Sequence, residues 1–328
     1  MASETEVDTV LEREPHNIEA LVAKGDHRSA AGDDRGATAF YKAALRAAQA
    51  VGALPMALKP AIEQAQQGIA RAEQQFRQHQ EHSLAEAGFA EGNRPARFQQ
   101  ALDILNGKIQ TNLTLQRPTS FYYPDLPQRR FFDPSEFAWA PAMEAAAAPI
   151  REELLAEMAK GLDAFSPYLI SDATRPRGNY HGLRDNPDWS TLELWDKGQP
   201  APISSRFPRT MAAVDAVDLP HISVRAPNIL FSKLCRGARI PPHHGMINTR
   251  LVCHLPLVVP PGCGFRVGGE TRLWEEGKLL VFDDSIEHEA WNEGASDRII
   301  LIFDVWRLEL EANERAAVTA LFEAVDGY

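Results

Sequence analysis

Residues 250–255 read Arg-Leu-Val-Cys-His-Leu, and their alternation predicts how the C-terminal part of the chain folds. Successive side chains of a β-strand point to opposite faces, so Arg250, Val252 and His254 share one face. The residues between them are apolar enough to form a hydrophobic core. Two basic side chains on an inner face are costly to bury unless an anion lies between them. The stretch therefore predicts a buried strand that contributes to a polar site.

Short β-branched segments separated by Pro, Gly and Asn lie on both sides of this stretch, as is typical of an all-β unit. The expected strands cover residues 228–234, 249–259, 264–267, 279–283 and 298–306. Helices are expected over 141–162 and 310–324. Together these elements predict a small β-barrel of the cupin or jelly-roll sort.

The first ninety residues are rich in Ala, Glu, Gln and Arg, which is typical of helices. A helix, a turn and a second helix are expected over 20–48, followed by a long helix over 56–87. The small or aromatic residues of the first pair are Gly25, Ala37, Tyr41 and Ala44. Their spacing resembles one tetratricopeptide-type repeat, although Arg28 stands where a large apolar residue is usual. The region is therefore either a helical scaffold or a groove for a protein partner.

Composition excludes several classes of protein. The 328 residues include 34 Lys and Arg against 45 Asp and Glu, a formal net charge of −11. Phosphate binding needs concentrated positive charge, so we expect neither a nucleic acid nor an anionic membrane as partner. No apolar run approaches the ~20 residues of a membrane span, and no signal peptide is visible.

The cysteines favour a reducing compartment. Cys235, Cys253 and Cys263 form no C-x-x-C pair, which argues against a disulfide framework. A cytoplasmic location is therefore expected. We interpret Cys253 as a core thiol and Cys263 as a turn residue.

Two of the ten histidines have the setting of metal ligands. His243 follows two prolines at the end of a strand, and His288 follows the expected strand 279–283. They can meet only if their strands share a sheet or face each other across a barrel mouth. Imidazole suits Fe, Zn, Cu and Ni, so the histidines alone do not choose the metal. Each could also be an ordinary surface or core histidine.

Arg298 begins the apolar strand that follows His288. A guanidinium at such a place is the natural bidentate partner of a carboxylate. Together with the histidines it predicts a site for a metal and a small dicarboxylate. The alternative is an ion pair of Arg298 with Asp304 or Asp283.

Three ordered motifs give a specific family resemblance. Residues 243–255, His-His-Gly-Met-Ile-Asn-Thr-Arg-Leu-Val-Cys-His-Leu, resemble the signature of aspartyl/asparaginyl β-hydroxylases. Residues 274–291 are similar to that family's second block, and Arg298 with residues 304–306 matches its third. The resemblance covers roughly 120–310. It implies a double-stranded β-helix fold, with Fe(II) as metal, 2-oxoglutarate as co-substrate and O₂.

Together with the helical composition of the first ninety residues, this resemblance predicts an α+β chain of several domains. A helical, tetratricopeptide-like region is expected at 1–90, a helical linker at 91–118 and an oxygenase domain at 119–328.

Each matched position takes an implied role from the resemblance. His243 and His288 correspond to the iron ligands. Arg298 corresponds to the residue that binds the side-chain carboxylate of 2-oxoglutarate. Ser232 and His254 correspond to residues that contact the same co-substrate.

Other positions differ from related oxygenases. Gly245 stands where most of these enzymes have an Asp or Glu ligand, but the family resembled here uses two histidines. The open position is left to water or, in related halogenases, to a halide. Asp284 is either a hydrogen-bond partner of that water or an exposed turn residue. Arg250 matches an arginine near the site, whereas Val252 replaces a second arginine that is usual there.

A Gly- and Asn-rich stretch resembles the substrate side of the family's site. It contains Arg175, Arg177, His181 and Arg184. These residues either bind an acidic substrate side chain or form an exposed charge cluster.

The leading interpretation is hydroxylation of the β-carbon of Asp or Asn in a peptide or protein. One alternative is a related 2-oxoglutarate enzyme that acts on a free amino acid or halogenates its substrate. Another is a non-catalytic scaffold in which repeat and barrel bind a partner.

Overall fold

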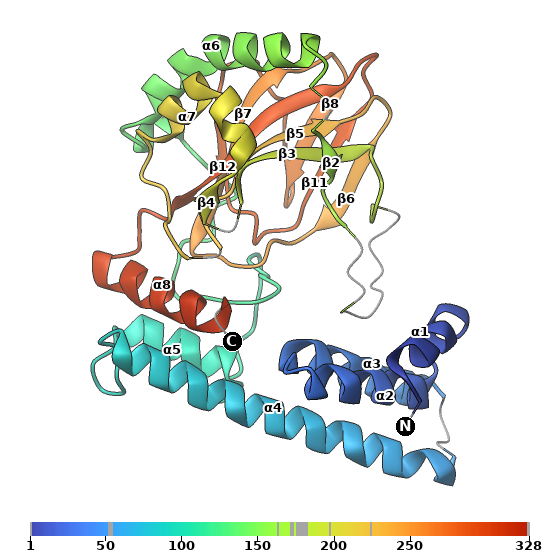
Figure 1. The fold of residues 1–328 in the computed structure, drawn as a ribbon. Coiled ribbons are helices and arrows are strands. Elements are labelled where there is room, and N and C mark those ends of the chain that lie inside the picture. Colours follow the sequence, from blue (N-terminus) through green and yellow to red (C-terminus); the bar gives the residue numbers. More distant parts are fainter. Residues whose placement is uncertain are drawn as a thin grey trace. The chain divides into compact units, whose positions relative to one another are not determined.

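The chain separates into two compact units. The structure is a computed structural model and describes residues 2–51, 55–162, 164–170, 174, 183–196, 198–223 and 225–326. Unit 1 comprises Met1–Glu81 and Ile170–Tyr180, and unit 2 comprises His82–Leu169 and His181–Tyr328. Helices make up the N-terminal part of the ribbon, whereas the sheets belong to unit 2 (Figure 1). The predicted domain boundaries at 90 and 118 stay a prediction.

Three helices of unit 1, α1, α2 and α3, begin at side chains that cap them. The elements are α1 (Glu4–Arg13), α2 (Ile18–Ala30), α3 (Asp34–Ala50), η1 (Met56–Leu58) and most of α4 (Lys59–Glu86). Ser3, Asn17 and Asp33 each accept a hydrogen bond from a backbone N–H in the first turn that follows. Such caps satisfy donors that would otherwise lack a partner, which explains where these helices start.

The ring of Tyr41 fixes the packing of α2, α3 and α4. A Cβ atom at Gly25 or Gly68 would lie 2.4 or 2.5 Å from this ring, so both helices approach it through glycine. The Tyr41 hydroxyl donates to Asp26 at 2.8 Å. Ala37 and Ala44 lie in the same hydrophobic cluster. The small residues noted in the sequence thus share one core, while the tetratricopeptide assignment itself stays a prediction.

The elements of unit 2 form two antiparallel sheets and the helices around them. Its helices are α5 (Ala96–Leu105), η2 (Pro134–Glu136), α6 (Ala140–Ala159), η3 (Pro202–Arg206), α7 (Pro208–Val214) and α8 (Ala312–Asp326). The larger sheet holds β1 (Phe131–Phe132), β10 (Leu280–Phe282), β7 (Arg250–Val258), β12 (Arg298–Trp306), β5 (Ile229–Leu234), β3 (Trp189–Asp196) and β2 (Ser166–Pro167), with β4 (Gln199–Pro200) beside β3. The smaller sheet has the order β6 (Arg239–His243), β11 (His288–Asn292), β8 (Cys263–Val267) and β9 (Glu270–Arg272).

Alternation along β7 and β12 separates the two faces of the larger sheet, as expected from the sequence. Leu251, Cys253 and Leu255 belong to one hydrophobic cluster with α6 and α7, which lie together over the outer face (Figure 1). Val252 and Ile300 belong to another cluster, with residues of the smaller sheet. The inner face therefore turns toward the smaller sheet.

The smaller sheet contains three strands that the sequence pattern does not reveal, namely β6, β9 and β11. Strand β6 includes Pro241 and Pro242, and proline lacks the N–H that a central strand must donate. The sheet order places β6 at an edge, where this loss is tolerated. Consequently, His243 ends β6 in the smaller sheet rather than the strand of residues 229–234, and His288 begins β11.

The predicted fold class is confirmed: a helical region precedes a double-stranded β-helix of two antiparallel sheets. The structure places the other expected strands, and the helices near 141–162 and 310–324, within a few residues of their predicted bounds. Within the described ranges, no helix is long and apolar enough to cross a membrane.

Gly68→Ala tests the packing against Tyr41. Alanine ordinarily stabilises a helix relative to glycine, but here its Cβ would overlap the ring. We expect a loss of about 1–3 kcal/mol in the free energy of unfolding, measured by urea denaturation followed by circular dichroism. Gln67→Ala on the exposed side of α4 is the matched control. Equal stability of the two variants would show that the packing of the Tyr41 ring does not require glycine at position 68.

Candidate functional site

The two predicted ligand histidines lie opposite each other in the smaller sheet. Antiparallel pairing of β6 with β11 sets His288 against His243, and the ring centroids are 4.1 Å apart. His288 is 8% exposed, and His243 is half-buried. Strands that share a sheet thus bring together two residues 45 positions apart in the chain.

Backbone contacts orient both imidazoles in the same way. Nδ1 of His243 lies 2.9 Å from the Pro241 carbonyl, and Nδ1 of His288 lies 2.9 Å from the Ile286 carbonyl. A carbonyl can only accept, so each Nδ1 bears the proton and each Nε2 keeps a free lone pair. In this tautomer Nε2 can bind a metal while the other ring nitrogen donates to a backbone carbonyl, a common arrangement of ligand histidines.

Burial keeps both histidines in the form that binds metals. Desolvation lowers the pKa of His243, and it lowers the pKa of His288 to about 3, so both rings are neutral near pH 7. Across the described residues, no group of three or more His, Cys, Asp or Glu side chains could hold a metal ion. The two histidines thus stand as a pair.

Among the described residues, no carboxylate is paired with the buried Arg298. Its side chain is 1% exposed, and its Nε and Nη2 atoms have no hydrogen bond. The guanidinium carbon lies 4.9 Å from the centroid of the Trp274 ring, a cation–π contact. Burial lowers the pKa of Arg298 to about 10, which leaves it charged at neutral pH. The alternative pairing is wrong, because Asp304 binds Arg250 and Asp283 binds Arg307.

His254 and Ser232 lie on the same inner face as Arg298. The His254 ring contacts Phe265 and Phe282, with centroids 5.0 and 4.8 Å away, and its Nδ1 has no partner. Burial first, and the nearby Arg298 charge second, hold the pKa of His254 well below its usual value. Ser232 is 1% exposed and accepts a 3.3 Å hydrogen bond from the Trp189 indole.

Arg250, in contrast, is neutralised by two carboxylates. It donates to Asp304 at 2.8 Å and to Asp284 at 3.0 Å. Burial alone would lower the pKa of Arg250, but these carboxylates raise it. Asp284 is 6% exposed, so it is not the exposed turn residue of the alternative. Burial raises the pKa of Asp284 to about 6 although Arg250 opposes this.

Asp284 also explains why position 245 is glycine. A Cβ atom at Gly245 would lie 2.1 Å from the Asp284 carboxylate, and the Gly245 N–H donates to the Asp284 carbonyl at 2.6 Å. The space in which a third ligand could begin is thus filled by another side chain. The second oxygen of Asp284, Oδ1, is buried without a partner.

Several predicted residues lie elsewhere or outside the described chain. Arg175, Arg177 and His181 fall outside the residues that the structure describes. Arg184 is described, and its backbone forms a parallel bridge with Leu169. Cys263 is buried at the start of β8 and not in a turn, because its side chain joins the core between the sheets.

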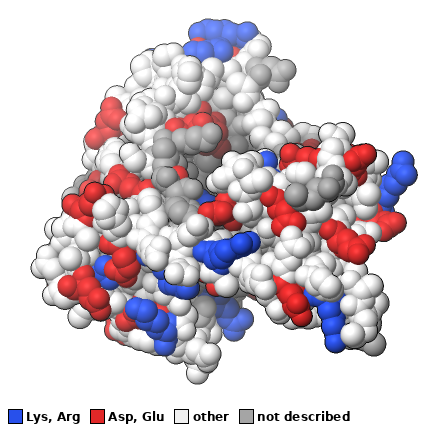
Figure 2. Space-filling model, turned by 60° about the horizontal axis from the view of Figure 1, so that its bottom comes forward, with Lys and Arg blue, Asp and Glu red and all other residues white. Residues whose placement is uncertain are grey.

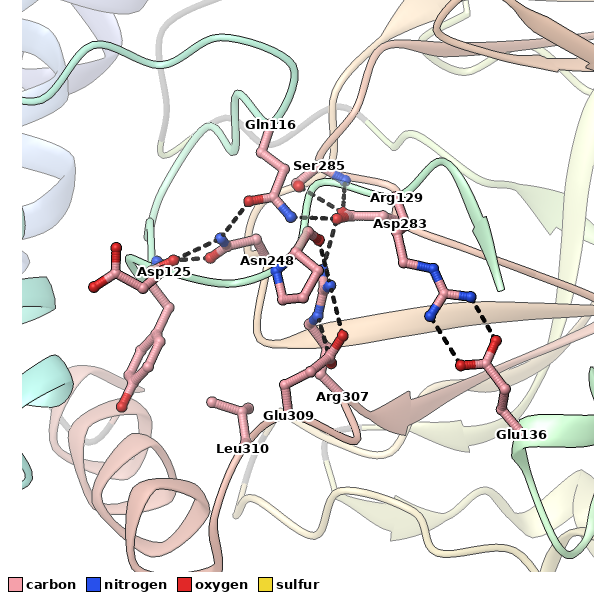
Figure 3. Close-up of polar contacts among 12 residues, drawn as sticks. Gln116, Asp125, Arg129, Glu136, Asn248, Asp283, Ser285, Arg307, Glu309 and Leu310 are labelled. Atoms are coloured by element: carbon pink, nitrogen blue, oxygen red, sulfur yellow. Dashed lines mark hydrogen bonds and ion pairs between the residues drawn. The ribbon is translucent and has the colours of Figure 1, made fainter. Parts of the chain in front are cut away.

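Sequence reasoning missed the residues that support the site. Trp274 and Trp189 lie within stretches that resemble the family, yet nothing in their local pattern marks them as partners of Arg298 and Ser232. Asp283, in the loop before His288, forms a buried network with Gln116 and Arg307, which are distant in the sequence (Figure 3). The one signal in the sequence is the pair of adjacent carboxylates Asp283 and Asp284, which is unusual directly after an apolar strand.

Comparison with known proteins agrees with this arrangement. The model of the family described as "Aspartyl/Asparaginyl beta-hydroxylase" matches residues 144–308, half of the chain. The chain belongs to this family. The match spans both histidines, Ser232, His254 and Arg298.

Curated relatives share this part of the chain. The "Aspartyl/asparaginyl beta-hydroxylase" of Mus musculus is 37% identical over 174 residues, which are 52% of this chain but 22% of that protein. The "Aspartate beta-hydroxylase domain-containing protein 2" of Homo sapiens is 32% identical over 218 residues, 65% of this chain and 57% of that protein. The chain thus spans a fifth to just over half of these relatives.

Similar solved structures include a "Cupin 2 conserved barrel domain protein" from Salinispora arenicola. It is 9% identical and covers 43% of this chain and 85% of its own, with a TM-score of 0.25.

Charges of both signs lie on the face of the molecule shown in Figure 2. On the face shown in Figure 2, Lys and Arg residues alternate with Asp and Glu residues. Over the described residues of that face, no continuous basic patch is visible. The unneutralised positive charge that stands out is instead the buried one of Arg298.

Gly245→Ala tests the contact with Asp284. The new Cβ must displace the carboxylate and disturb its ion pair with Arg250, so we expect a loss of about 1–3 kcal/mol in the free energy of unfolding. Gly269→Ala is the control, because a Cβ there meets no atom within 4 Å. Gly245→Asp adds a second negative charge and should destabilise at least as much. Thermal melting measures all three variants, and equal melting temperatures would refute the contact.

Proposed function

We propose that this chain is an Fe(II)- and 2-oxoglutarate-dependent dioxygenase that hydroxylates the β-carbon of Asp or Asn in a peptide or protein. The observation that supports this most strongly is Arg298, buried and without a counter-ion. An uncompensated buried charge is costly, so the site is arranged for an anion that arrives from outside. Family membership and the pair of oriented histidines support the choice of iron and 2-oxoglutarate.

The residues present fit a metal bound by two histidines. Nε2 of His243 and Nε2 of His288 would bind Fe(II), while their Nδ1 protons stay on backbone carbonyls. When bound, the iron would supply the oxidising chemistry that consumes O₂ and 2-oxoglutarate, releases succinate and CO₂, and inserts oxygen into an unactivated C–H bond. Imidazole pairs also suit other transition metals, so the identity of the metal rests on the family.

The residues present also fit a dicarboxylate. The unpaired Nε and Nη2 atoms of Arg298 would bind the distal carboxylate in a bidentate manner. The Trp274 ring holds the guanidinium from its face, which leaves the planar edge free for the ligand. His254 Nδ1, if it bears the proton, and the Ser232 hydroxyl would donate further hydrogen bonds to oxygens of the same molecule.

Asp284 would hold water next to Gly245. Its Oδ1 atom lacks a partner, and Arg250 fixes the carboxylate through Oδ2. A halide beside this carboxylate would meet a like charge, which favours hydroxylation over halogenation. The free amino acid as substrate and the non-catalytic scaffold remain the alternatives. A protein partner at the helical region also stays a proposal.

Turnover of 2-oxoglutarate tests the proposal. The purified protein should convert 2-oxoglutarate to succinate with Fe(II) and not without it, with or without chloride. Mass spectrometry of a panel of Asp and Asn peptides should then show a gain of one oxygen. A chlorinated product would favour the halogenase, and absence of turnover with every peptide and amino acid would favour the scaffold.

Substitution of either histidine should abolish the reaction. His243→Ala or His288→Ala removes one of only two proposed protein ligands, so Fe(II) binding and succinate formation should both collapse. His221→Ala, a histidine of the same unit that contacts Trp195, is the matched control and should retain both. Near-normal turnover in either ligand variant would contradict the assignment.

Arg298→Ala should weaken the binding of 2-oxoglutarate. Loss of a charge-assisted contact with a buried carboxylate costs roughly 2–5 kcal/mol, so the apparent 2-oxoglutarate constant should rise well over tenfold. Arg298→Lys should restore binding only in part, because lysine lacks the planar fork. The measurement is the dependence of succinate formation on 2-oxoglutarate. An unchanged constant would assign Arg298 a purely structural role.

A further inference from the structure

One segment outside the family match is bonded to both loops that flank the histidines. We call residues 116–121 the bridging segment. The N–H of Arg117 donates to Ser285 at 2.7 Å, in the loop before His288. The N–H of Thr119 donates to Gly245 at 2.9 Å, in the loop after His243. The family match begins at residue 144, so this segment lies before the matched residues, in the preceding part of unit 2.

The side chain of Gln116 makes the same connection inside the protein. It is fully buried, and its amide nitrogen donates to Asp283 Oδ2 at 2.6 Å. Its amide oxygen accepts from Asn248 Nδ2 at 3.1 Å. Figure 3 shows Gln116 between these two residues. Asp283 belongs to the His288 loop and Asn248 to the His243 loop, so one amide bonds to both.

Both partners of Gln116, Asp283 and Asn248, form further hydrogen bonds. Asp283 also accepts from Arg307 Nη1 at 2.7 Å, and both side chains of this ion pair are 0% exposed. Asn248 accepts from the Tyr123 N–H at 2.7 Å and donates to the Tyr123 carbonyl at 2.9 Å. Ser285 donates to Asp283 through its N–H. The loops are thus parts of one buried polar network.

Such a network restrains where the loops can lie. A buried donor or acceptor that loses its partner pays the full cost of desolvation, so the loops cannot separate without breaking several bonds at once. The backbones that carry these bonds lead directly into His243, Gly245, Asp284 and His288. A small shift of either loop would change the distance between the two imidazoles.

We propose that Gln116 is a positioning residue that sets the spacing of His243 and His288 for metal binding. It acts through Asp283 and Asn248 and does not contact the metal. This inference rests on the proposed two-histidine metal site. Groups bonded directly to ligand residues commonly change metal affinity by about 10–100-fold, so the lower end of this range is expected for Gln116, which is one bond further from the ligands.

Titration with Co(II), followed by visible absorption, tests the role without relying on turnover. Gln116→Ala should raise the Co(II) dissociation constant by about tenfold and alter the spectrum. Thr210→Val is the matched control. It removes a 2.7 Å hydrogen bond from a fully buried hydroxyl to Glu153, between α7 and α6. It should lower the melting temperature while leaving the Co(II) constant unchanged.

The outcomes distinguish this inference from the proposed function. If the unaltered protein binds Co(II) and His243→Ala does not, the metal site stands. Wild-type affinity and spectrum in Gln116→Ala would then overturn the positioning role alone. If the unaltered protein binds no Co(II), or if His243→Ala binds it normally, both proposals fail together.

Hydrogen exchange on the unaltered protein covers the case in which Gln116→Ala does not fold. Coupling is reciprocal: a segment that favours metal binding must itself be stabilised by the metal. Addition of Zn(II) should slow exchange of the amides of Arg117, Thr119 and Ser120, with α6 as the internal control. Exchange that stays unchanged in the bridging segment would overturn the proposal.

Discussion

The antiparallel register between β6 and β11 is the constraint on which the site depends. It places His288 opposite His243, and a shift by one residue would turn one imidazole to the other face of the sheet. Carbonyls of Pro241 and Ile286 then fix both rings from behind. The inner face of the larger sheet lies opposite the two histidines. Alternation along its strands places Arg298 and His254 on this inner face.

Much of this arrangement could be predicted from local patterns. Period-two alternation in residues 250–255 is strong enough to assign both faces of β7, because one face packs on α6 and the other on the second sheet. The same reasoning fails for β6 and β11. Pro241 and Pro242 interrupt the first, and residues 288–292 are too polar to indicate a strand. Their pairing with each other stabilises them, and no local pattern reports such pairing.

The candidate residues could be predicted, whereas their partners could not. Motifs identified His243, His288 and Arg298 because the chemistry of a site selects residue types at fixed spacings. The Gln116 bond to Asp283 joins positions 167 apart, and the Arg298–Trp274 contact depends on how a loop folds back. Gly245 is the clearest case: its sequence suggests a missing ligand, but the structure shows that Asp284 requires the space.

Three arginines of unit 2, the buried Arg298 and Arg307 and the half-buried Arg250, differ in how their charge is neutralised. Arg307 is matched by Asp283, and Arg250 is matched by Asp284 and Asp304. Arg298 alone among these three keeps two donor atoms without partners. Its pKa of about 10 means that deprotonation does not relieve this cost at neutral pH. An anion that binds the folded protein and not the unfolded chain removes the cost, and it thereby stabilises the fold. The same interaction that would select the co-substrate thus also couples its binding to the stability of unit 2.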